Sequence, residues 1–334
     1  MIARSLLSAL FGFAAALVVG CGELPPPPAA TVAKARIGPD DSDAWSLVPA
    51  AASALVDLNL AALRASAWSQ SLVTGGFAED REERLRTFGY DVFTDVDRLV
   101  VAGLDVEGQS QQVVVVLGRI DAARVAHAFT AAAPDAKEAR WRDCPIWEAP
   151  GRAVALVGRA LVHGTSETVR AAIDAAWGVV PSARAGALGE LARAVDAEAR
   201  PPAVTLAVLV TDELRARADG TLELPGSLRR AAARLDLGAD LELDAQALFS
   251  DGGAAATAAE SWRASLRDLT ANRFVRVMGF GPVVGGVALQ AEGARVHGRL
   301  RLTEDKREAI SDRFLALMKA LAAARAQGAA PAAP

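Results

Sequence analysis

This chain of 334 residues has three histidines, the side chains most often used for acid–base catalysis. The histidines lie far apart in the sequence, at His127, His163 and His297. Only His163 lies near a nucleophile, Ser166, and that pairing would suit acyl transfer by a serine hydrolase. The residues around Ser166 lack the G-x-S-x-G turn of such enzymes. Thr165 and Ser166 suit a helix N-terminus instead, so we expect no catalytic residue here.

A glycine-rich stretch between Gly279 and Gly286 is a second candidate, because glycine loops can hold a phosphate. Its spacing, G-x-G-x-x-x-G, differs from the dinucleotide-binding pattern, and a strand pattern follows it where that pattern requires a helix. The sequence also has no phosphate-loop Gly-Lys-Ser or Gly-Lys-Thr. We therefore interpret this stretch as a bend before a hairpin and expect no cofactor.

Carboxylates gather at two places, in a turn-like region and along a strand. They are Asp91, Asp95 and Asp97, and then Asp240, Glu242 and Asp244. Alternation places the second group on one strand face, where it could reach a cation. A calcium loop, however, needs a flexible arc of oxygens and a sharp glycine turn. With no Cys/His pair at zinc spacing either, we expect solvated side chains and no metal site.

Positive charge forms a strip on one face of a strand near the end of the chain, at Arg295, His297, Arg299 and Arg301. These side chains could contact anionic lipid headgroups or a partner protein. A solvated sheet face is the interpretation that we favour.

A hydrophobic run over residues 6–19 follows Arg4 and ends in Val18-Val19-Gly20-Cys21. A charged start, an apolar core and a small residue before the cut are typical of a secretory signal. The alternative is an uncleaved membrane helix, but the run is shorter than the ~20 residues that spanning requires. The final four residues resemble the lipobox of bacterial lipoprotein precursors.

That resemblance implies cleavage after Gly20 and acyl chains on Cys21. Gly22, where an Asp would favour retention in the inner membrane, implies an outer-membrane anchor with the protein facing the periplasm. The alternative is the outer face of the inner membrane. The expected partners are thus the membrane, through the lipid on Cys21, and an envelope protein. The second cysteine, Cys144, would have no disulfide partner; a buried small hydrophobe is the favoured interpretation, and a reactive thiol is the alternative.

Composition limits the function classes further. Hydrophobic residues make up 52% of the chain and aromatic residues only 5%, so the core is expected to consist of Ala, Val and Leu. Removal of residues 1–20 deletes one charge, Arg4, and takes the formal net charge from −4 to −5. Mild acidity argues against nucleic acid, which usually meets a basic patch.

The chain divides at changes in composition. We expect a signal peptide over residues 1–20, a flexible tether over 21–43 and a disordered tail over 326–334. Between them we expect a first half over 44–180, a connector with a short helix over 181–202, and a second half over 203–325.

Both halves repeat a β-hairpin followed by a helix. Strands 287–292 and 295–302 flank Gly293-Ala294, and the turn would pair Glu292 with Arg295 and Leu289 with Gly298. A helix over 304–324, with Thr303 as N-cap, would cover the apolar face of this hairpin with Ile310, Phe314, Leu317, Met318 and Leu321.

The remaining expected elements follow the same pattern. Strand pairs and single strands are expected at 99–106 with 113–117, 141–148, 153–157, 161–163, 204–210 and 237–248. Helices are expected after Asp121 and after Thr165, as N-caps, and over 254–271. A strand and two helices are expected over 54–88. The predicted fold class is α+β, with two antiparallel sheets that helices cover on one face.

The body, over about 45–325, also resembles a loosely defined group of uncharacterised exported bacterial envelope proteins rich in Ala and Leu. Two phrases carry the resemblance. One is Val48-Pro49-Ala50 followed by Leu55, Asp57, Leu58 and Leu63, and the other is the strand–Gly–Thr/Ser–helix step at 162–169. This resemblance implies an envelope location and no known activity.

Two function classes fit these observations. The first is a lipid-anchored envelope component without catalysis, which binds a partner or gives structural support. The second is a carrier or chaperone that holds a lipid or acyl chain between sheet and helices. An apolar cavity would favour the second, because small core side chains can leave such a space. An enzyme is the third and least favoured class.

Overall fold

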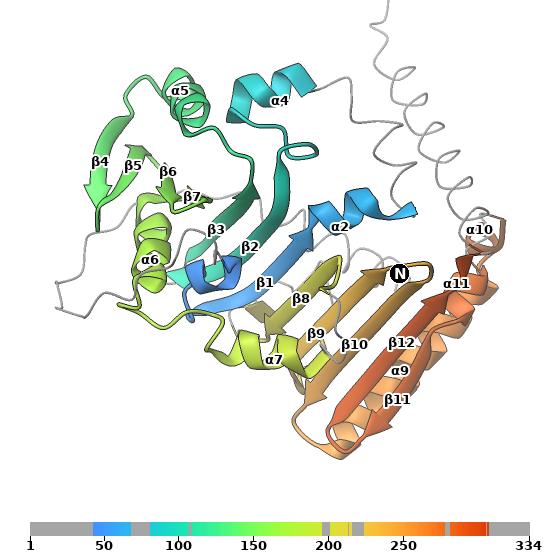
Figure 1. Cartoon of the computed structure of the whole chain (residues 1–334). Coiled ribbons are helices and arrows are strands. Elements are labelled where there is room, and N and C mark those ends of the chain that lie inside the picture. Colours follow the sequence, from blue (N-terminus) through green and yellow to red (C-terminus); the bar gives the residue numbers. More distant parts are fainter. Residues whose placement is uncertain are drawn as a thin grey trace, which may run out of the picture.

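The computed structural model describes residues 43–67, 81–106, 109–195, 201–212, 214–215, 224–277, 281–304 and 306. Within them, twelve strands form one antiparallel sheet in the order β11-β12-β10-β9-β8-β1-β2-β3-β7-β6-β5-β4 (Figure 1). The strands are β1 (Ala52–Asn59), β2 (Val96–Val106), β3 (Gln109–Gly118), β4 (Lys137–Trp141), β5 (Cys144–Ala149), β6 (Arg152–Val157), β7 (Ala160–Gly164), β8 (Val204–Leu209), β9 (Leu228–Leu237), β10 (Leu241–Phe249), β11 (Ala288–Glu292) and β12 (Arg295–Leu302).

Helices lie on both sides of this sheet. They are η1 (Ala44–Leu47), α2 (Leu60–Ala65), α4 (Arg81–Phe88), α5 (Ala122–Ala132), α6 (Ser166–Ala176), α7 (Ala187–Val195), α9 (Gly252–Ala271), α10 (Arg273–Val277) and α11 (Gly281–Gly285). The fold is therefore mixed α+β with an antiparallel sheet, as the sequence predicts. Among the described residues, no helix combines the length and the apolar character that crossing a membrane would take.

The prediction of two separate sheets is wrong. Strand β1 pairs with β2 on one side and with β8 on the other, through partners such as Asp57 with Val100 and Asp57 with Thr205. The first seven strands and the last five are thus neighbouring blocks of one sheet. Strand β1 joins the two blocks by pairing with β8, which is far from it in the sequence. Local sequence patterns do not reveal such a pairing.

The prediction that helices cover only one face is also wrong. Strands β2 and β3 are apolar on both sides: Val100 and Val115 pack with η1 and α6, whereas Val96 and Val116 pack with Tyr90 and α5. A central strand that is buried on both faces reads as a continuous apolar run. We call the side covered by η1, α6 and α7 the α6 face, and the side covered by α5, α9 and α11 the α9 face.

The last hairpin has the predicted register. Glu292 pairs with Arg295 and Leu289 with Gly298, and Gly293 has a φ of 54°, which suits the glycine of a two-residue turn. The described helices on its apolar face are α9 and α11. Apart from Glu304 and Lys306, the helix predicted over 304–324 lies outside the described residues, as do the signal, most of the tether and the tail.

Two predicted strands are each split by a turn. The strand over 141–148 is the end of β4 and most of β5, which meet at Arg142 and Asp143 with φ values of 47° and 67°. The strand predicted over 237–248 begins in the last residue of β9 and runs through a turn into β10. The prediction therefore does not include the rest of β9. Non-glycine residues with positive φ are uncommon, so the sequence Arg142-Asp143 does not by itself predict the turn between β4 and β5.

Helix starts follow the predicted capping chemistry. The Asp121 carboxylate accepts from the backbone N–H groups of Ala123 and Arg124 at the start of α5. Thr165 is the N-cap of α6, whose residues Val169 and Ile173 are buried on the sheet. A side-chain oxygen at the N-cap satisfies donors that have no partner in the helix.

Candidate functional site

The one Ser/His proximity of the sequence does not form a catalytic pair. The His163 ring lies on the α9 face, where Nε2 is 3.3 Å from the Tyr90 hydroxyl. Ser166 begins α6, which packs on the opposite face. Burial lowers the pKa of His163 to about 4 and raises the pKa of Tyr90 to about 12. Both side chains are therefore neutral near pH 7; Tyr90 belongs to the buried core, and the half-buried His163 ring lies against it.

Thr165 and Thr168 account for the polar character at the start of α6. The two threonines form a capping box, and the Thr165 hydroxyl donates to Oε1 of buried Gln111 at 2.6 Å. The other two histidines, His127 on α5 and His297 on β12, are exposed, and for His297 this agrees with the predicted solvated sheet face. The second part of the glycine-rich stretch forms α11.

The predicted acidic and basic strips face each other across neighbouring strands. Arg299 Nε lies 2.7 Å from Asp244 Oδ1, and Arg301 lies 2.7 Å from Asp240 and 3.3 Å from Glu242. The prediction of two solvated faces does not include this contact, because the pairing of β10 with β12 joins segments far apart in the sequence. Cross-strand pairing balances charge on this part of the α6 face.

The first acidic cluster also has structural roles. Asp91 is buried and accepts from the backbone N–H of Phe93 at 2.9 Å and from Arg84 at 3.2 Å. Asp97 forms an ion pair with Arg64 at 2.7 Å. Within the described ranges, no group of His, Cys, Asp or Glu side chains could hold a metal ion.

Cys144 is buried in the core of the first half, in agreement with the favoured interpretation. Burial raises the pKa of its thiol to about 11. A protonated, buried thiol is a poor nucleophile.

Two of the cavities lined by described residues are candidate sites. The first is a groove of about 380 Å³ between the α9 face of β8–β12 and helices α9 and α11. We call it the α9 groove. It is lined by Leu206, Ala231, Ala232, Ala233, Leu243, Ala245, Gln246, Ala247, Trp262, Leu266, Leu269, Val283, Val284, Val287, Leu289, Val296, Gly298, Arg299 and Leu300.

A row of small residues forms the floor of the α9 groove. Strand register aligns one residue from each of five strands, in the order Leu206, Ala233, Ala245, Gly298 and Leu289. The three central members have at most one side-chain carbon, so the sheet is hollow beneath α9. Trp262 and Leu266 on α9 and Val283 on α11 form the roof.

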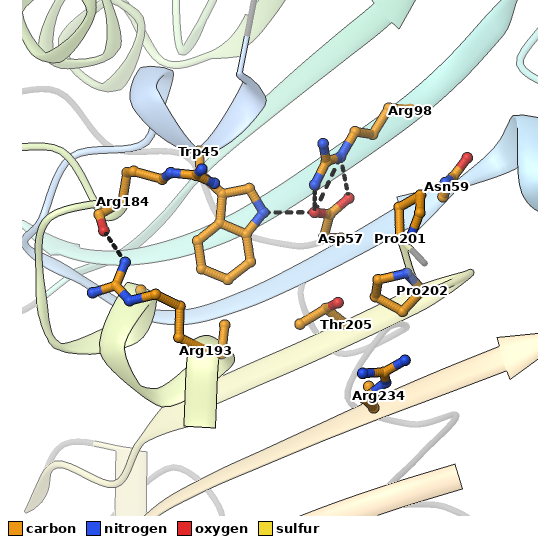
Figure 2. Close-up of a pocket in the computed structure, with 12 residues that line it drawn as sticks. Trp45, Asp57, Asn59, Arg98, Arg184, Arg193, Pro201, Pro202, Thr205 and Arg234 are labelled. Carbon is orange, nitrogen blue, oxygen red and sulfur yellow. Dashed lines mark hydrogen bonds and ion pairs between the residues drawn. The ribbon is translucent and has the colours of Figure 1, made fainter. Parts of the chain in front are cut away.

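The second cavity, of about 160 Å³, lies on the α6 face, and we call it the Asp57 pocket (Figure 2). Its lining includes several charged and polar side chains, in contrast to that of the α9 groove. It is lined by Trp45, Asp57, Asn59, Arg98, Arg184, Gly189, Ala192, Arg193, Pro201, Pro202, Thr205 and Arg234.

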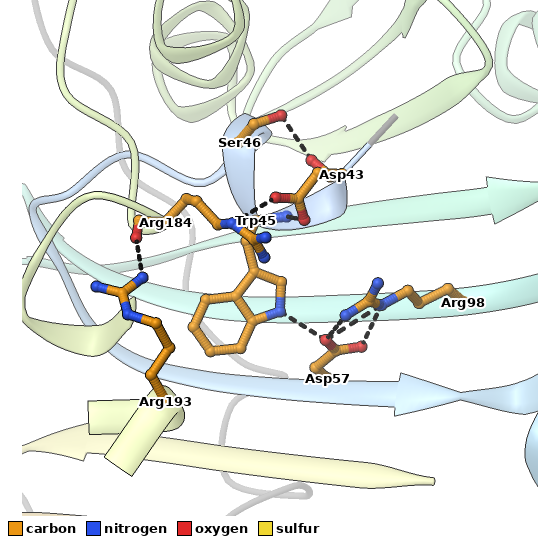
Figure 3. A network of polar contacts seen from close by, with 7 residues as sticks. All are labelled: Asp43, Trp45, Ser46, Asp57, Arg98, Arg184 and Arg193. Carbon is orange, nitrogen blue, oxygen red and sulfur yellow. Dashed lines mark hydrogen bonds and ion pairs between the residues drawn. The ribbon is translucent and has the colours of Figure 1, made fainter. Parts of the chain in front are cut away.

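A polar network organises one wall of the Asp57 pocket (Figure 3). Buried Asp57 accepts from the Trp45 indole N–H at 2.5 Å and from Arg98 Nε at 2.8 Å. Arg184 pairs with Asp43 at 3.0 Å, and Arg193 donates to the backbone carbonyl of Arg184 at 3.0 Å. The hydrogen bond to Asp57 raises the pKa of Arg98, so the guanidinium stays charged.

Neither cavity can be located from the sequence patterns alone. The one available signal for the Asp57 pocket is Asp57 itself, because a single acid among Leu55, Val56 and Leu58 is an unusual strand residue. The signal for the α9 groove was the run of alanines at 231–233 and at 245 and 247. Interpreting that signal requires the register of five strands, which the sequence does not give.

Comparisons with known proteins give no family for this chain. No protein-family model matches it, and no curated protein matches it either. Among solved structures, crystal forms III, I and IV of TP0453 align with TM-scores of 0.46, 0.45 and 0.44 at 8%, 10% and 10% identity. The alignments cover 80%, 84% and 80% of this chain and 97%, 98% and 96% of the TP0453 chain. Values this low do not establish that the two chains share a fold.

Proposed function

We propose that this chain is an exported, lipid-anchored protein of the cell envelope that holds an acyl chain in the α9 groove. The observation that carries the proposal is the lining of that groove, which consists almost wholly of Ala, Val, Leu, Gly and Trp side chains. Removing apolar ligand surface from water is the main source of affinity in such a site.

The shape of the floor favours an alkyl chain over a bulky ring system. The row Ala233, Ala245 and Gly298 runs across the strands, and Leu206 and Leu289 stand at its two ends. A row of small residues between larger ones makes a narrow trough, which a linear chain fills. Each buried methylene would contribute about 0.8 kcal/mol.

The lipobox-like sequence that ends at Cys21 supports a location beside a source of such ligands. Acyl chains on Cys21 would hold the body at a membrane surface, and the residues 21–43 would serve as the tether. The role is one of binding and is not catalytic. The candidate nucleophile Ser166 and the candidate base His163 face opposite sides of the sheet.

Binding of cis-parinaric acid, a fluorescent linear fatty acid, tests the proposal. We expect saturable binding to the full chain carrying Cys21→Ser, and lipid in an organic extract of the purified protein. Ala245→Leu should abolish most of the binding because the added carbons fill the trough. The same variant should melt at or above the wild-type temperature, because it fills a cavity.

Ala256→Leu is the matched control, since Ala256 is exposed on α9. It should bind the probe as the parent protein does. Equal binding by Ala245→Leu and the parent would contradict the proposal. So would binding that starts only after residues 307–334 are removed, because the end of the chain would then be the occupant. If neither the full chain nor the chain without residues 307–334 binds the probe, the acyl-chain proposal is wrong, and a partner-binding or structural role is the alternative.

The anchor has its own test. The wild-type chain should fractionate with outer membranes and incorporate labelled palmitate, whereas Cys21→Ser should appear in the soluble periplasmic fraction. Retention of Cys21→Ser in membranes after a high-salt wash would contradict lipid anchoring.

A further inference from the structure

The Asp57 pocket has many hydrogen-bond donors and few acceptors. Four arginines line it, and Asp57 is the one carboxylate among its lining residues. That carboxylate already accepts from Trp45 and Arg98. Its negative charge is therefore compensated within the wall of the pocket, and it does not offset the other arginines.

Two of the other three arginines have carboxylate partners. Arg184 pairs with Asp43 at 3.0 Å, and Arg234 pairs with Asp236 at 2.6 Å. Arg193 is different: it donates to the backbone carbonyl of Arg184, and no carboxylate within the described part of the chain pairs with it. The pocket thus has a surplus of positive charge at Arg193.

Thr205 provides a second, independent indication of a ligand. Its side chain is only 8% exposed and lines the pocket between Asp57 and Arg234 (Figure 2). Among the residues for which contacts are described, none forms a hydrogen bond with its hydroxyl. Thr205 lines the pocket, so its hydroxyl can donate to a polar group bound there.

Asn59 adds a further donor. Its Oδ1 accepts from the backbone N–H of Ala62 at 3.0 Å and caps α2, which leaves the Nδ2 amide hydrogens for the pocket. Asn59, Thr205 and Arg193 belong to β1, β8 and α7, so the donors come from elements that the fold holds in place.

We propose that the Asp57 pocket binds a small oxyanion, either a phosphate group or a carboxylate. Arg193 provides the compensating charge, and the Thr205 hydroxyl and the Asn59 amide donate to the oxygens. Charge-assisted hydrogen bonds of this kind are stronger than neutral ones. The site lies on the α6 face and is separate from the α9 groove, so it does not depend on the proposed function. Ordered water alone is the competing occupant.

Titration of the full chain with sodium phosphate and with sodium acetate, against sodium chloride of equal ionic strength, tests this site. We expect one of the two oxyanions to raise the melting temperature above the value in chloride and to give a one-site isotherm by calorimetry. The anion that binds identifies the class, phosphate or carboxylate. Equal melting temperatures in all three salts would show that the pocket holds only water.

Two variants locate the site. Arg193→Gln and Thr205→Val should each weaken binding about tenfold or more, because each removes a donor to a charged group. Thr205→Val should melt no lower than the wild type in chloride, because the lost hydroxyl bonds to none of the described residues. Arg159→Gln, an exposed arginine in the turn between β6 and β7, should bind as the wild type does. Binding that persists unchanged in both Arg193→Gln and Thr205→Val would place the anion elsewhere and overturn the proposal.

Discussion

Thr205 and Leu206 are consecutive residues of β8 whose side chains line different cavities. Thr205 faces the Asp57 pocket on the α6 face, and Leu206 faces the α9 groove on the other side. Successive side chains of a strand point to opposite faces. The row of residues across the strands that contains Thr205 therefore lines the Asp57 pocket, and the adjacent row that contains Leu206 lines the α9 groove. The polar row comprises Asp57, Thr205, Arg234, Asp244 and Arg299.

Asp57 is the residue of that row whose loss should cost most. We expect Asp57→Asn to lower the free energy of unfolding by about 2 kcal/mol, because Arg98 would lose its carboxylate partner in a largely buried site. The cost is below that of a fully buried pair, since the Arg98 side chain is 39% exposed. Urea denaturation at neutral pH measures it.

Asp97→Asn is the matched control, because the Asp97 side chain is 52% exposed and pairs with Arg64 at the surface. Its effect should be within about 0.5 kcal/mol. Equal losses in the two variants would mean that the Asp57 network adds no more than a surface ion pair.

The register of the last hairpin gives a second prediction. Leu300 is buried on the α9 face, whereas Arg299 points to the α6 face and pairs with Asp244. Leu300→Asp should lower the free energy of unfolding by about 3 kcal/mol or more, because it buries an unpaired charge. Arg299→Gln should cost less than about 1 kcal/mol. Similar melting curves for the two variants would contradict this assignment of faces.

Local structure was predictable wherever neighbouring residues determine it. Gly293-Ala294 sets the pairing of Leu289 with Gly298, because a two-residue turn leaves one register that puts apolar residues on one face. Asp121 and Thr165 marked helix starts, because short polar side chains satisfy the first free N–H groups of a helix.

Long-range pairing was not predictable from the same patterns. The contact of Leu55 with Ala207, which joins the two blocks of the sheet, links strands separated by about half of the chain. The pairing of β10 with β12 likewise brings Asp244 to Arg299. Both candidate sites consist of rows across several strands, so neither is visible until the strand order is known.

The start of α6 provides a third prediction. Thr165→Ala should lower the free energy of unfolding by about 1–2 kcal/mol, because it removes the N-cap and the donor to buried Gln111. Ser166→Ala should change it by less than about 0.5 kcal/mol, as at a surface site. Thermal and urea melts distinguish the two. A hydrolase activity that is lost in Ser166→Ala while the melting curve stays unchanged would contradict the proposal that this segment is not catalytic.

His163 makes the stability of the fold depend on pH in a defined direction. Burial lowers its pKa in the folded protein from 6.5 to about 4, so the ring stays neutral where the unfolded chain binds a proton. The unfolded state then takes up more protons than the folded state as the pH falls through this interval. Stability is therefore full above about pH 6.5 and is lost progressively down to about pH 4.

Between about pH 7.5 and pH 5, this residue should remove about 2 kcal/mol from the free energy of unfolding, measured by urea denaturation at each pH. His163→Gln should lose less stability than the wild type over that interval, because glutamine can still bond to the Tyr90 hydroxyl and binds no proton. His127→Gln, on the exposed side of α5, controls for the removal of a histidine and should keep the wild-type loss. If His163→Gln and the wild type lost equal stability, the ring would be free to take up a proton in the folded protein, and its burial against Tyr90 would be wrong.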